Sequence, residues 1–459
     1  SCAHQGTVYM KNLLLLLLLA VHALCFAREV PVDVQDCIPQ FDSYVAEIAQ
    51  AYHIPGMAFF ITDSERTLFS KRCGQCTDMG QLFFIGSMSK SYTALCIMQL
   101  VEQGLVQLDD DISVYLPEYA FAKPVTVRSL LNHTSGFDTH MKLYNAQLTK
   151  SYGSHEYANV NYDLLGKIIE TVSGMSYEAY VREHVFLPLG MDDSIADTGT
   201  AKGSEKLLWG NRNWFGFFVR GDADYPGEKS WFHEPAGFLA ITPADHAKYL
   251  RMYLNGGRTE QGAPIISRES LDAMWYDNVP LGTKFNAFYG RGWNYMEWNG
   301  MPVVFHGGQV ENYITYMFIL PDRGLAVCFM VNGNDEFGMN ALMDNAFWDS
   351  LSILNGSSPK KVNHAAYPLT HLALDALYLC MLLLSLFLLV RAFARRRKPL
   401  LMVLGYAVWS LFLLLFTKLC FDTPLWVVRS FVPDLFCVIV ACVLLSLSGG
   451  VISLIRLKQ

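Results

Sequence analysis

The chain has 459 residues, of which 52% are hydrophobic and only 17% are charged, so part of it is not expected to face water. This length exceeds that of one ordinary domain, so more than one region is expected. A formal net charge of -7 and a pI near 5.9 argue against nucleic-acid binding.

The first segment in chain order has the pattern of an export signal. Lys11 precedes the apolar run Leu13–Leu19, and Ala27 is a small residue in front of a cut at Arg28. We therefore expect residues 1–27 to be upstream residues followed by a signal peptide. An uncleaved signal anchor is the alternative.

Residues 28–360 are predicted to form one α+β domain outside the cytoplasm. Strand patterns occur near both ends of this region, and mostly helical, loop-rich sequence lies between them. This arrangement predicts a sheet made of strands from both ends, with an inserted helical region beside it. The expected helices are Phe41–Tyr52, 88–103 and Asp163–Val172, and the expected strands are Gly56–Thr62, Thr67–Lys71, Pro302–His306, Tyr313–Leu320 and Gly324–Asn332.

Residues 361–459 are predicted to form a membrane domain. The three apolar stretches Leu372–Val390, Leu400–Phe416 and Leu435–Ile455 have lengths that suit transmembrane helices. Five basic residues between positions 391 and 398 follow the first stretch, which places that loop inside and the large N-terminal region outside. Buried core helices of a soluble protein are the alternative.

The candidate nucleophile is Ser87, which forms a Ser-x-x-Lys match with Lys90 at the predicted start of a helix. Residues three apart share a helix face, so the amine can reach the hydroxyl. The positive end of the helix favours both an alkoxide and a neutral lysine. Two other matches begin at Ser357 and Ser358, in a breaker-rich linker without a rigid frame. An N-cap serine with a solvated lysine is the alternative for Ser87.

Two further motifs are weak when taken singly. Tyr157 and Asn159 precede a helical stretch and offer a phenol for proton transfer and an amide for hydrogen bonds with a substrate. His306, Gly307 and Gly308 lie at the end of a predicted strand, where the glycines would let a ligand approach the backbone. A histidine at the end of a strand is more often structural than functional.

These three motifs, Ser-x-x-Lys, Tyr-x-Asn and His-Gly-Gly, occur in an order that resembles the serine β-lactamase and penicillin-binding-protein superfamily, in its class C β-lactamase-related branch. The similarity covers about residues 35–350 and includes several framework segments. These segments are Leu130–Gly136, Pro188–Met191, Gly237–Asp245 and Tyr289–Trp293. The resemblance implies a β-lactamase/transpeptidase-like fold, with an antiparallel sheet flanked by helices plus a helical region.

The resemblance also implies an acyl transfer in which Ser87 attacks a carbonyl while Lys90 and Tyr157 share the base and acid roles. Asn159 would orient the substrate, and the backbone amides of Ser87 and Gln309 would hold the oxyanion. No metal and no organic cofactor is required in this scheme.

The third motif departs from that of β-lactamases, which carry a lysine where this chain has His306. A histidine is largely neutral at pH 7, so recognition of a substrate carboxylate is in doubt. His306, Gly307 and Gly308 remain, with Asn159, the predicted substrate-binding set. The resemblance favours a D-peptidase or esterase over an efficient β-lactamase.

The leading hypothesis is a membrane-anchored, extracytoplasmic serine hydrolase of the cell envelope. It would act on amide or ester bonds of D-amino-acid peptides, esters or β-lactam-like compounds. Its substrate would be a small molecule or peptide, for example one derived from the cell wall, and the protein would cross the cell membrane several times. The alternative is a catalytically inactive sensor or binding module that signals through its spans. Three spans are few for a pore, so we expect them to act as an anchor.

Two other segments leave alternatives open. Cys73 and Cys76 resemble a redox or metal-binding pair, but no second pair or nearby histidine completes a zinc site. A turn between strands, with or without a small disulfide, is the favoured interpretation. The aromatic residues of the segment Asn211–Glu234 either line a cleft or belong to the core.

Overall fold

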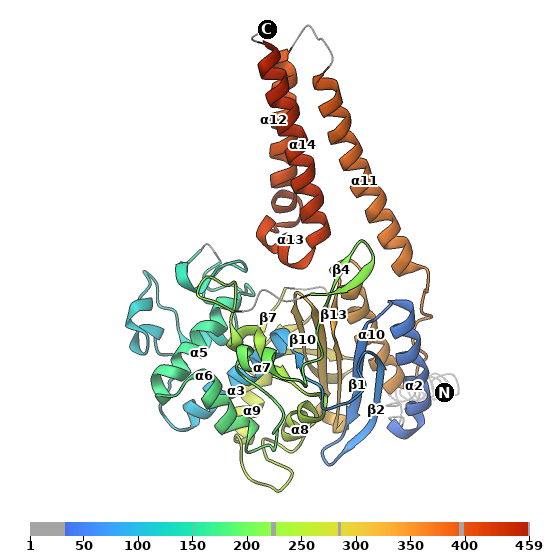
Figure 1. The fold of residues 1–459 in the computed structure, drawn as a ribbon. Coiled ribbons are helices and arrows are strands. Elements are labelled where there is room, and N and C mark those ends of the chain that lie inside the picture. The colour runs from blue at the N-terminus through green and yellow to red at the C-terminus, as the bar shows by residue number, and fades with distance from the viewer. Residues whose placement is uncertain (1–32, 150, 222–225, 283–285, 394–398, 458–459) are drawn as a thin grey trace, which may run out of the picture.

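The computed structural model describes residues 33–149, 151–221, 226–282, 286–393 and 399–457. The predicted signal peptide within residues 1–27 lies outside the described residues. So do four of the five basic residues after the first apolar stretch. Figure 1 shows a body of helices and strands from which the long C-terminal helices extend.

An eight-stranded antiparallel sheet forms the centre of the body and joins strands from the two ends of this region. Across the sheet the strands are β2 (Thr67–Gly74), β1 (Gly56–Thr62), β12 (Leu325–Val331), β11 (Tyr313–Leu320), β10 (Met301–Val310), β9 (Asn294–Trp298), β8 (Phe288–Tyr289) and β7 (Val279–Pro280). Shorter strands are β3 (Phe83–Phe84), β4 (Asn211–Trp214), β5 (Phe217–Arg220), β6 (Ala240–Ile241) and β13 (Gly333–Asn334). The helices of the body are α2 (Val34–Ala51), α3 (Ser89–Glu102), α4 (Val127–Leu131), α5 (Asn159–Ser173), α6 (Tyr177–Val181), α7 (Thr198–Gly203), α8 (Pro243–Leu254), α9 (Arg268–Tyr276) and α10 (Met339–Leu354).

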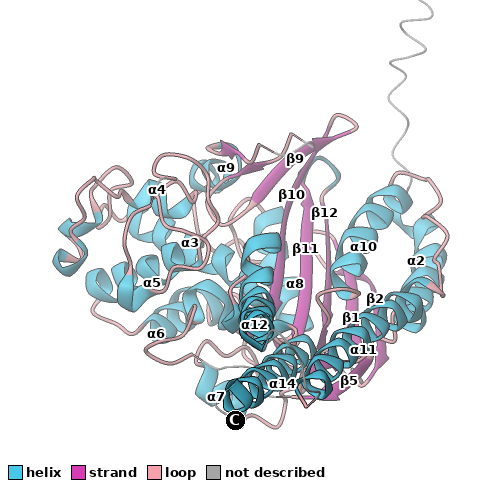
Figure 2. Cartoon of the chain, turned by 90° about the horizontal axis from the view of Figure 1, so that it is seen from above, coloured by secondary structure: helices cyan, strands magenta, loops and turns pink. Residues whose placement is uncertain are grey.

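Both faces of the sheet are buried, because helices cover each of them. Successive side chains of β1 point to opposite faces. Phe59 and Ile61 pack in the core beneath α2 and α10, whereas Ala58 and Phe60 belong to the larger core that includes α3 and α8. Figure 2 shows α2 and α10 on one side of the sheet and α3 on the other. This layering places the start of α3 beside the middle of the sheet. Ser87 lies directly before that start.

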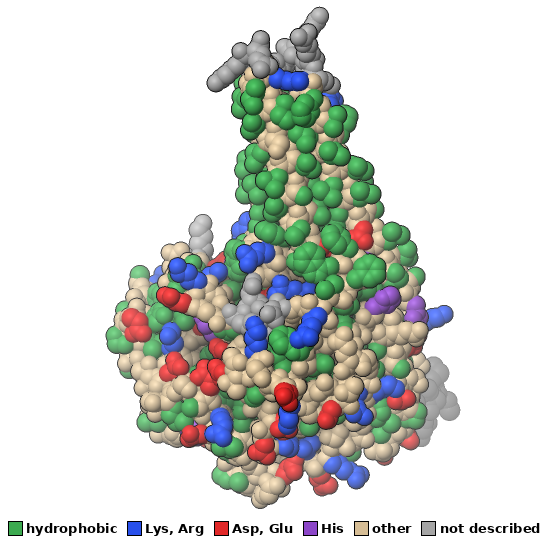
Figure 3. Space-filling model, in the orientation of Figure 1, with side chains coloured by type: hydrophobic (Ala, Val, Ile, Leu, Met, Phe, Trp, Pro, Cys, Tyr) green, Lys and Arg blue, Asp and Glu red, His purple; other side chains and the backbone are tan. Residues whose placement is uncertain are grey.

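The three long helices are α11 (Ala366–Ala392), α12 (Pro399–Phe421) and α14 (Pro433–Leu457), and the short α13 (Leu425–Phe431) lies at their foot. All three long helices are long and apolar enough to cross a membrane. Figure 3 shows hydrophobic side chains over these helices, whereas charged side chains are spread over the body. The helix α14 packs against both α11 and α12.

Buried polar contacts fix the long helices to the body. Nε2 of His371 in α11 lies 2.6 Å from Oδ2 of Asp335, and both side chains are buried. The backbone amide of Phe215 donates to Oδ2 of Asp434, at the start of α14, at 3.1 Å. The helices are therefore joined to the body by side-chain contacts as well as by the chain itself.

The predicted α+β class, with an antiparallel sheet followed by three apolar helices, is confirmed. The strands Gly56–Thr62 and Tyr313–Leu320 have the bounds that their sequence pattern indicated. The helix expected from Phe41 begins earlier, at Val34, because the side chain of Asp33 caps it.

Three details differ from the expectations. The strand expected to end at His306 continues to Val310, since both glycines of the third motif stay in register with β11. The small disulfide considered for Cys73 and Cys76 is not formed, and both thiols are free. The helix Leu425–Phe431 was not predicted, because it is too short to give a periodic pattern.

Candidate active site

Ser87 lies on a sharp turn between a short strand and a helix. Gly86 has a φ of 54°, residues Gly86–Met88 form a 3-10 turn, and α3 begins at Ser89. A Cβ at Gly86 would overlap the backbone nitrogen of Gln309 in β10. The positive φ and this close approach both require glycine. The turn thereby brings Ser87 next to the segment whose amide is the second predicted oxyanion donor.

The amine of Lys90 lies at the centre of the site. Its side chain is fully buried. Nζ lies 3.0 Å from Oγ of Ser87, 2.7 Å from Oδ1 of Asn159 and 2.7 Å from the carbonyl oxygen of Ala236. Asn159 is the first residue of α5, and Ala236 belongs to the turn that precedes β6. Three segments that are far apart in the sequence therefore meet at one nitrogen atom.

The three partners of this amine differ in whether they can donate a hydrogen bond. The side-chain oxygen of Asn159 and the carbonyl oxygen of Ala236 can only accept, so they take two N–H bonds. The hydroxyl of Ser87 can also give its proton to the lone pair of a neutral lysine. Burial lowers the pKa of Lys90 to about 7, with the carboxylate of Asp163 opposing that shift. Near pH 7 a neutral amine is therefore populated, and its lone pair points at Ser87.

Tyr157 lies in the loop before α5, and its phenol is hydrogen-bonded to Ser87. Its ring centroid lies 4.8 Å from Nζ of Lys90. Burial raises the pKa of the phenol, and the hydrogen bond with Ser87 opposes the shift. The phenol therefore keeps its proton at neutral pH and can donate it. The structure brings together the hydroxyl, amine and phenol of all three predicted catalytic residues.

His133 supports this loop, a role that the sequence did not indicate. Its ring is fully buried, and its centroid lies 4.4 Å from that of Tyr157. Nδ1 accepts from the backbone amide of Ala158 at 3.2 Å and from the side-chain amide of Asn161 at 2.8 Å. Burial lowers the pKa of His133 well below its usual value, so Nδ1 stays an acceptor. His133 thereby fixes the backbone between Tyr157 and Asn159, and only its place in a framework segment could have drawn attention to it.

His306 is buried, and the protein itself pairs both of its ring nitrogens. Nδ1 donates to the carbonyl oxygen of Gly307 at 2.6 Å, and Nε2 accepts from the hydroxyl of Tyr289 at 3.1 Å. Burial lowers the pKa of His306 to about 3, so the ring is neutral. His306, Gly307 and Gly308 are not among the residues that line the cavity at Ser87. Their contact with a substrate therefore stays a prediction.

Ser87 opens into a cavity of about 830 Å³ between the body and the long helices. Tyr157, Asn159, Gln309 and Glu336 lie at the same end as Ser87, and Nε2 of Gln309 donates to Oε2 of Glu336 at 2.8 Å. Most of the remaining wall consists of apolar side chains of α11 to α14. Among the described residues that line this cavity there is no lysine or arginine.

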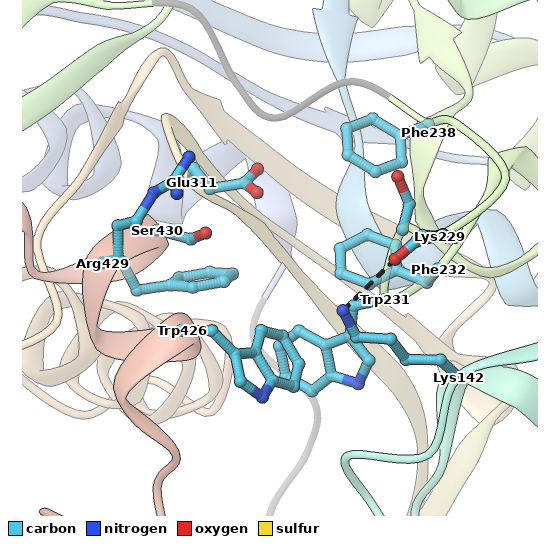
Figure 4. Close-up of a pocket in the computed structure, with 11 residues that line it drawn as sticks. Lys142, Lys229, Trp231, Phe232, Phe238, Glu311, Trp426, Arg429 and Ser430 are labelled. Atoms are coloured by element: carbon cyan, nitrogen blue, oxygen red, sulfur yellow. Dashed lines mark hydrogen bonds between the residues drawn. The ribbon is translucent and has the colours of Figure 1, made fainter. Parts of the chain in front are cut away.

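A second pocket of about 290 Å³ adjoins the first, and Figure 4 shows the side chains around it. It shares Trp231, Phe232 and Phe431 with the larger cavity. The ring centroids of Trp231 and Trp426 lie 5.2 Å apart, and Nζ of Lys142 lies 4.3 Å from the centroid of Trp426. This contact joins the body to α13 at the edge of the cavity.

The aromatic residues of Asn211–Glu234, predicted either to line a cleft or to belong to the core, lie in different environments. Trp231 and Phe232 line the cavity. Phe217, at the tip of the hairpin of β4 and β5, is 75% exposed. Among the described aromatic residues of this segment, those at the end nearest the active site line the cavity.

Comparison with known proteins shows the family. The model of the family described as Beta-lactamase matches residues 41–346, which is more than half of the chain. The chain therefore belongs to the beta-lactamase family, and the resemblance noted from the three motifs is confirmed. The three apolar helices lie beyond the matched region.

Individual relatives are distant. Penicillin-binding protein 4 of Amycolatopsis lactamdurans is 26% identical over 326 residues, covering 61% of this chain and 82% of that protein. Protein flp of Staphylococcus aureus (strain MW2) is 23% identical over 337 residues, covering 66% of this chain and 64% of that protein.

Solved structures share the fold. The octameric penicillin-binding protein homologue from Pyrococcus abyssi has a TM-score of 0.59 and 26% identity, covering 72% of this chain and 79% of that chain. The D-amino acid amidase from Ochrobactrum anthropi SV3, complexed with L-phenylalanine amide, has a TM-score of 0.52 and 24% identity. The match covers 66% of this chain and 92% of the amidase chain. At that identity the amidase shows the fold alone.

Replacing Gly308 by alanine is expected to disable the site. A Cβ there would overlap the carbonyl oxygen of Ile85, directly before the nucleophile turn, and the hydroxyl of Thr315. The turn and the Gln309 amide must then move apart, and loss of one oxyanion donor typically lowers rates by about 100-fold to 1,000-fold. The rate of Ser87 labelling by a fluorophosphonate measures the effect. Gly203→Ala is the matched control, since a Cβ there meets nothing, and equal labelling of both variants would contradict the prediction.

The acylation rate of Ser87 is expected to rise with pH, with a midpoint near 7. Below the midpoint Lys90 carries a proton and cannot accept one, so the rate should fall about tenfold for each pH unit. The midpoint is measured from single-turnover labelling between pH 5 and pH 9.

Removal of a carboxylate identifies the titrating group. Because Asp163 raises the pKa of Lys90, Asp163→Asn should shift the midpoint to lower pH. The control is Asp272→Asn, which removes an ion pair with Arg268 on α9 and should leave the midpoint unchanged. If the labelling rate does not depend on pH, or if Asp163→Asn leaves the midpoint unchanged, the base is a group other than Lys90.

Proposed function

We propose that this protein is a membrane-anchored serine hydrolase that forms an acyl-enzyme on Ser87 and cleaves amide or ester bonds. The observation that carries the proposal is the amine of Lys90, which is fully buried and lies 3.0 Å from the nucleophile. Burying an amine without an acidic partner in contact is costly, and a serine that merely caps a helix needs no such group. The arrangement is typical of an activated nucleophile.

In the proposed reaction, Oγ of Ser87 forms a bond with the substrate carbonyl carbon while its proton passes to Lys90. The backbone amides of Ser87 and Gln309 stabilise the oxyanion. The bond to the leaving amine or alcohol then breaks, and Lys90 returns the proton through Tyr157 to the leaving group. A water molecule gives a proton to the neutral Lys90 and attacks the acyl ester. The bond between the acyl carbon and Oγ then breaks, Oγ takes the proton from Lys90, and the carboxylic acid leaves.

The described side chains that line the cavity at Ser87 favour substrates that are not anionic at the reacting end. His306 is neutral and buried, and Glu336 places a carboxylate beside Gln309. Similarity to penicillin-binding proteins supports D-amino-acid amides, esters and peptides, along with β-lactam-like compounds, as the substrates to test.

We further propose that residues 28–360 form the catalytic domain, that residues 361–459 form the membrane domain, and that the catalytic domain lies outside the cytoplasm. Arg391 and Arg456 lie near the ends of α11 and α14 that are remote from the body. Basic residues favour the cytoplasmic side of a membrane, which supports this orientation.

The Ser87 adduct tests the function directly. The full chain in lipid nanodiscs is incubated with a fluorophosphonate or a fluorescent penicillin, and the modified residue is mapped by mass spectrometry. We expect one adduct, on Ser87, and its loss in Ser87→Ala because the nucleophile is removed. Ser358→Ala, in an exposed Ser-x-x-Lys match, should keep the adduct. A folded wild-type protein that no acyl donor modifies would instead support the inactive sensor.

A matched pair of substrates tests the expected charge preference. A D-alanyl-D-alanine amide should be hydrolysed at least about tenfold faster than the same dipeptide with a free C-terminal carboxylate. The reason is that Glu336 repels the carboxylate while His306 offers no positive charge. The two values of kcat/KM are measured by release of the amine product, and faster hydrolysis of the free acid would show that a cation reaches the site.

A further inference from the structure

We propose that the substrate is an amphiphile whose long apolar acyl chain enters the cavity from the lipid bilayer, between α11 and α12, while its ester or amide carbonyl lies at Ser87. This inference rests on the proposed hydrolase function and names the substrate class of the same site. It gives the three helices a part in substrate binding, whereas the sequence predicted only an anchor.

The membrane helices form the apolar wall of the catalytic cavity itself. Leu374 and Met381 of α11, Phe412 and Phe416 of α12, and Leu435 of α14 all line it. Ser87 lines the same cavity, so no separate pocket intervenes between these side chains and the nucleophile. A volume of about 830 Å³ falls in the range of sites that enclose small-molecule ligands.

The cavity reaches the surface that would face lipid. Leu377 of α11 and Phe412 of α12 line it and are 55% and 49% exposed, and Phe421 at the end of α12 is 71% exposed. All three belong to helices that are apolar enough to span a membrane. In a bilayer such side chains contact acyl chains instead of water, so the cavity wall at these residues reaches the hydrocarbon.

The dimensions match one leaflet. From Leu374 to Met381 the wall extends about 10 Å along α11, and from Trp409 to Phe421 it extends about 18 Å along α12. One leaflet contributes about 15 Å of hydrocarbon. Both wall segments begin near the body and end close to the middle of their helices, which span Ala366–Ala392 and Pro399–Phe421. The cavity would therefore occupy the leaflet adjacent to the catalytic site.

The polarity of the cavity orients an amphiphile within it. The hydrogen-bonding groups of Ser87, Tyr157 and Asn159 lie at the body end, whereas the helix end is mostly apolar, with the hydroxyls of Tyr378 and Thr417 as exceptions. A peptide with several exposed amides would leave them unpaired against the helices, which costs free energy. An acyl chain brings no polar group of its own to that wall.

The reaction of such a substrate follows the proposed scheme. Oγ of Ser87 bonds to the carbonyl carbon, and the head-group alcohol or amine leaves with a proton. The acyl chain remains in the cavity as the Ser87 ester until water releases it as a fatty acid.

The test compares p-nitrophenyl acetate with p-nitrophenyl octanoate on the full chain in nanodiscs. Burial of each methylene group favours binding by about fourfold, so kcat/KM for the octanoate is expected to be at least about 100-fold higher. Met381→Trp, which fills the cavity, should lower the octanoate-to-acetate ratio by at least tenfold. Leu386→Trp lies on the same helix, is 45% exposed and does not line the cavity, so its ratio should equal that of the wild type.

The outcomes separate this inference from the proposed function. If intact mass shows a Ser87 acetyl adduct but the octanoate-to-acetate ratio is near one, the hydrolase stands and the lipid-like substrate is overturned. A ratio that Met381→Trp leaves unchanged also overturns it, because the preference then comes from partition into the nanodisc and the cavity holds only a structural lipid. If no ester gives an adduct on Ser87, the proposed function itself fails.

Discussion

The structure depends on how one buried amine is held. Lys90 has two neighbours that only accept hydrogen bonds and one, the Ser87 hydroxyl, that can also donate. Burial makes the neutral form accessible near pH 7, and the fixed acceptors then direct the lone pair toward the nucleophile. The turn at Gly86, the first residue of α5 and the segment that contains Ala236 must all be in place for this arrangement. Much of the body can be understood as the frame that holds these three segments together.

Local patterns were enough to predict much of this frame. The mostly apolar runs Gly56–Thr62 and Tyr313–Leu320 gave correct strands, and the order of three short motifs indicated the family. The residues predicted to be catalytic, Ser87, Lys90 and Tyr157, lie together in the structure. Such features were accessible because they are encoded within a few neighbouring residues.

Features that depend on distant contacts were not accessible. His133 has a positive φ of 59° and bonds to residues that lie 25 and 28 positions away, which no local pattern reveals. The pairing of His306 with Tyr289 likewise arises only when β8 and β10 join one sheet. The largest omission was the place of the apolar helices. Hydropathy indicated that they suit a bilayer, but not that their foot closes over the active site.

One short segment connects the bilayer to the oxyanion side of the site. Asp335 holds α11 through His371, and the next residue, Glu336, accepts a hydrogen bond from the side chain of Gln309. A tilt of α11 that accommodates a thicker or thinner bilayer therefore pulls on a strand that borders the nucleophile. If the protein is the hydrolase proposed above, its rate then depends on the thickness of the bilayer around α11 as well as on the residues of the site.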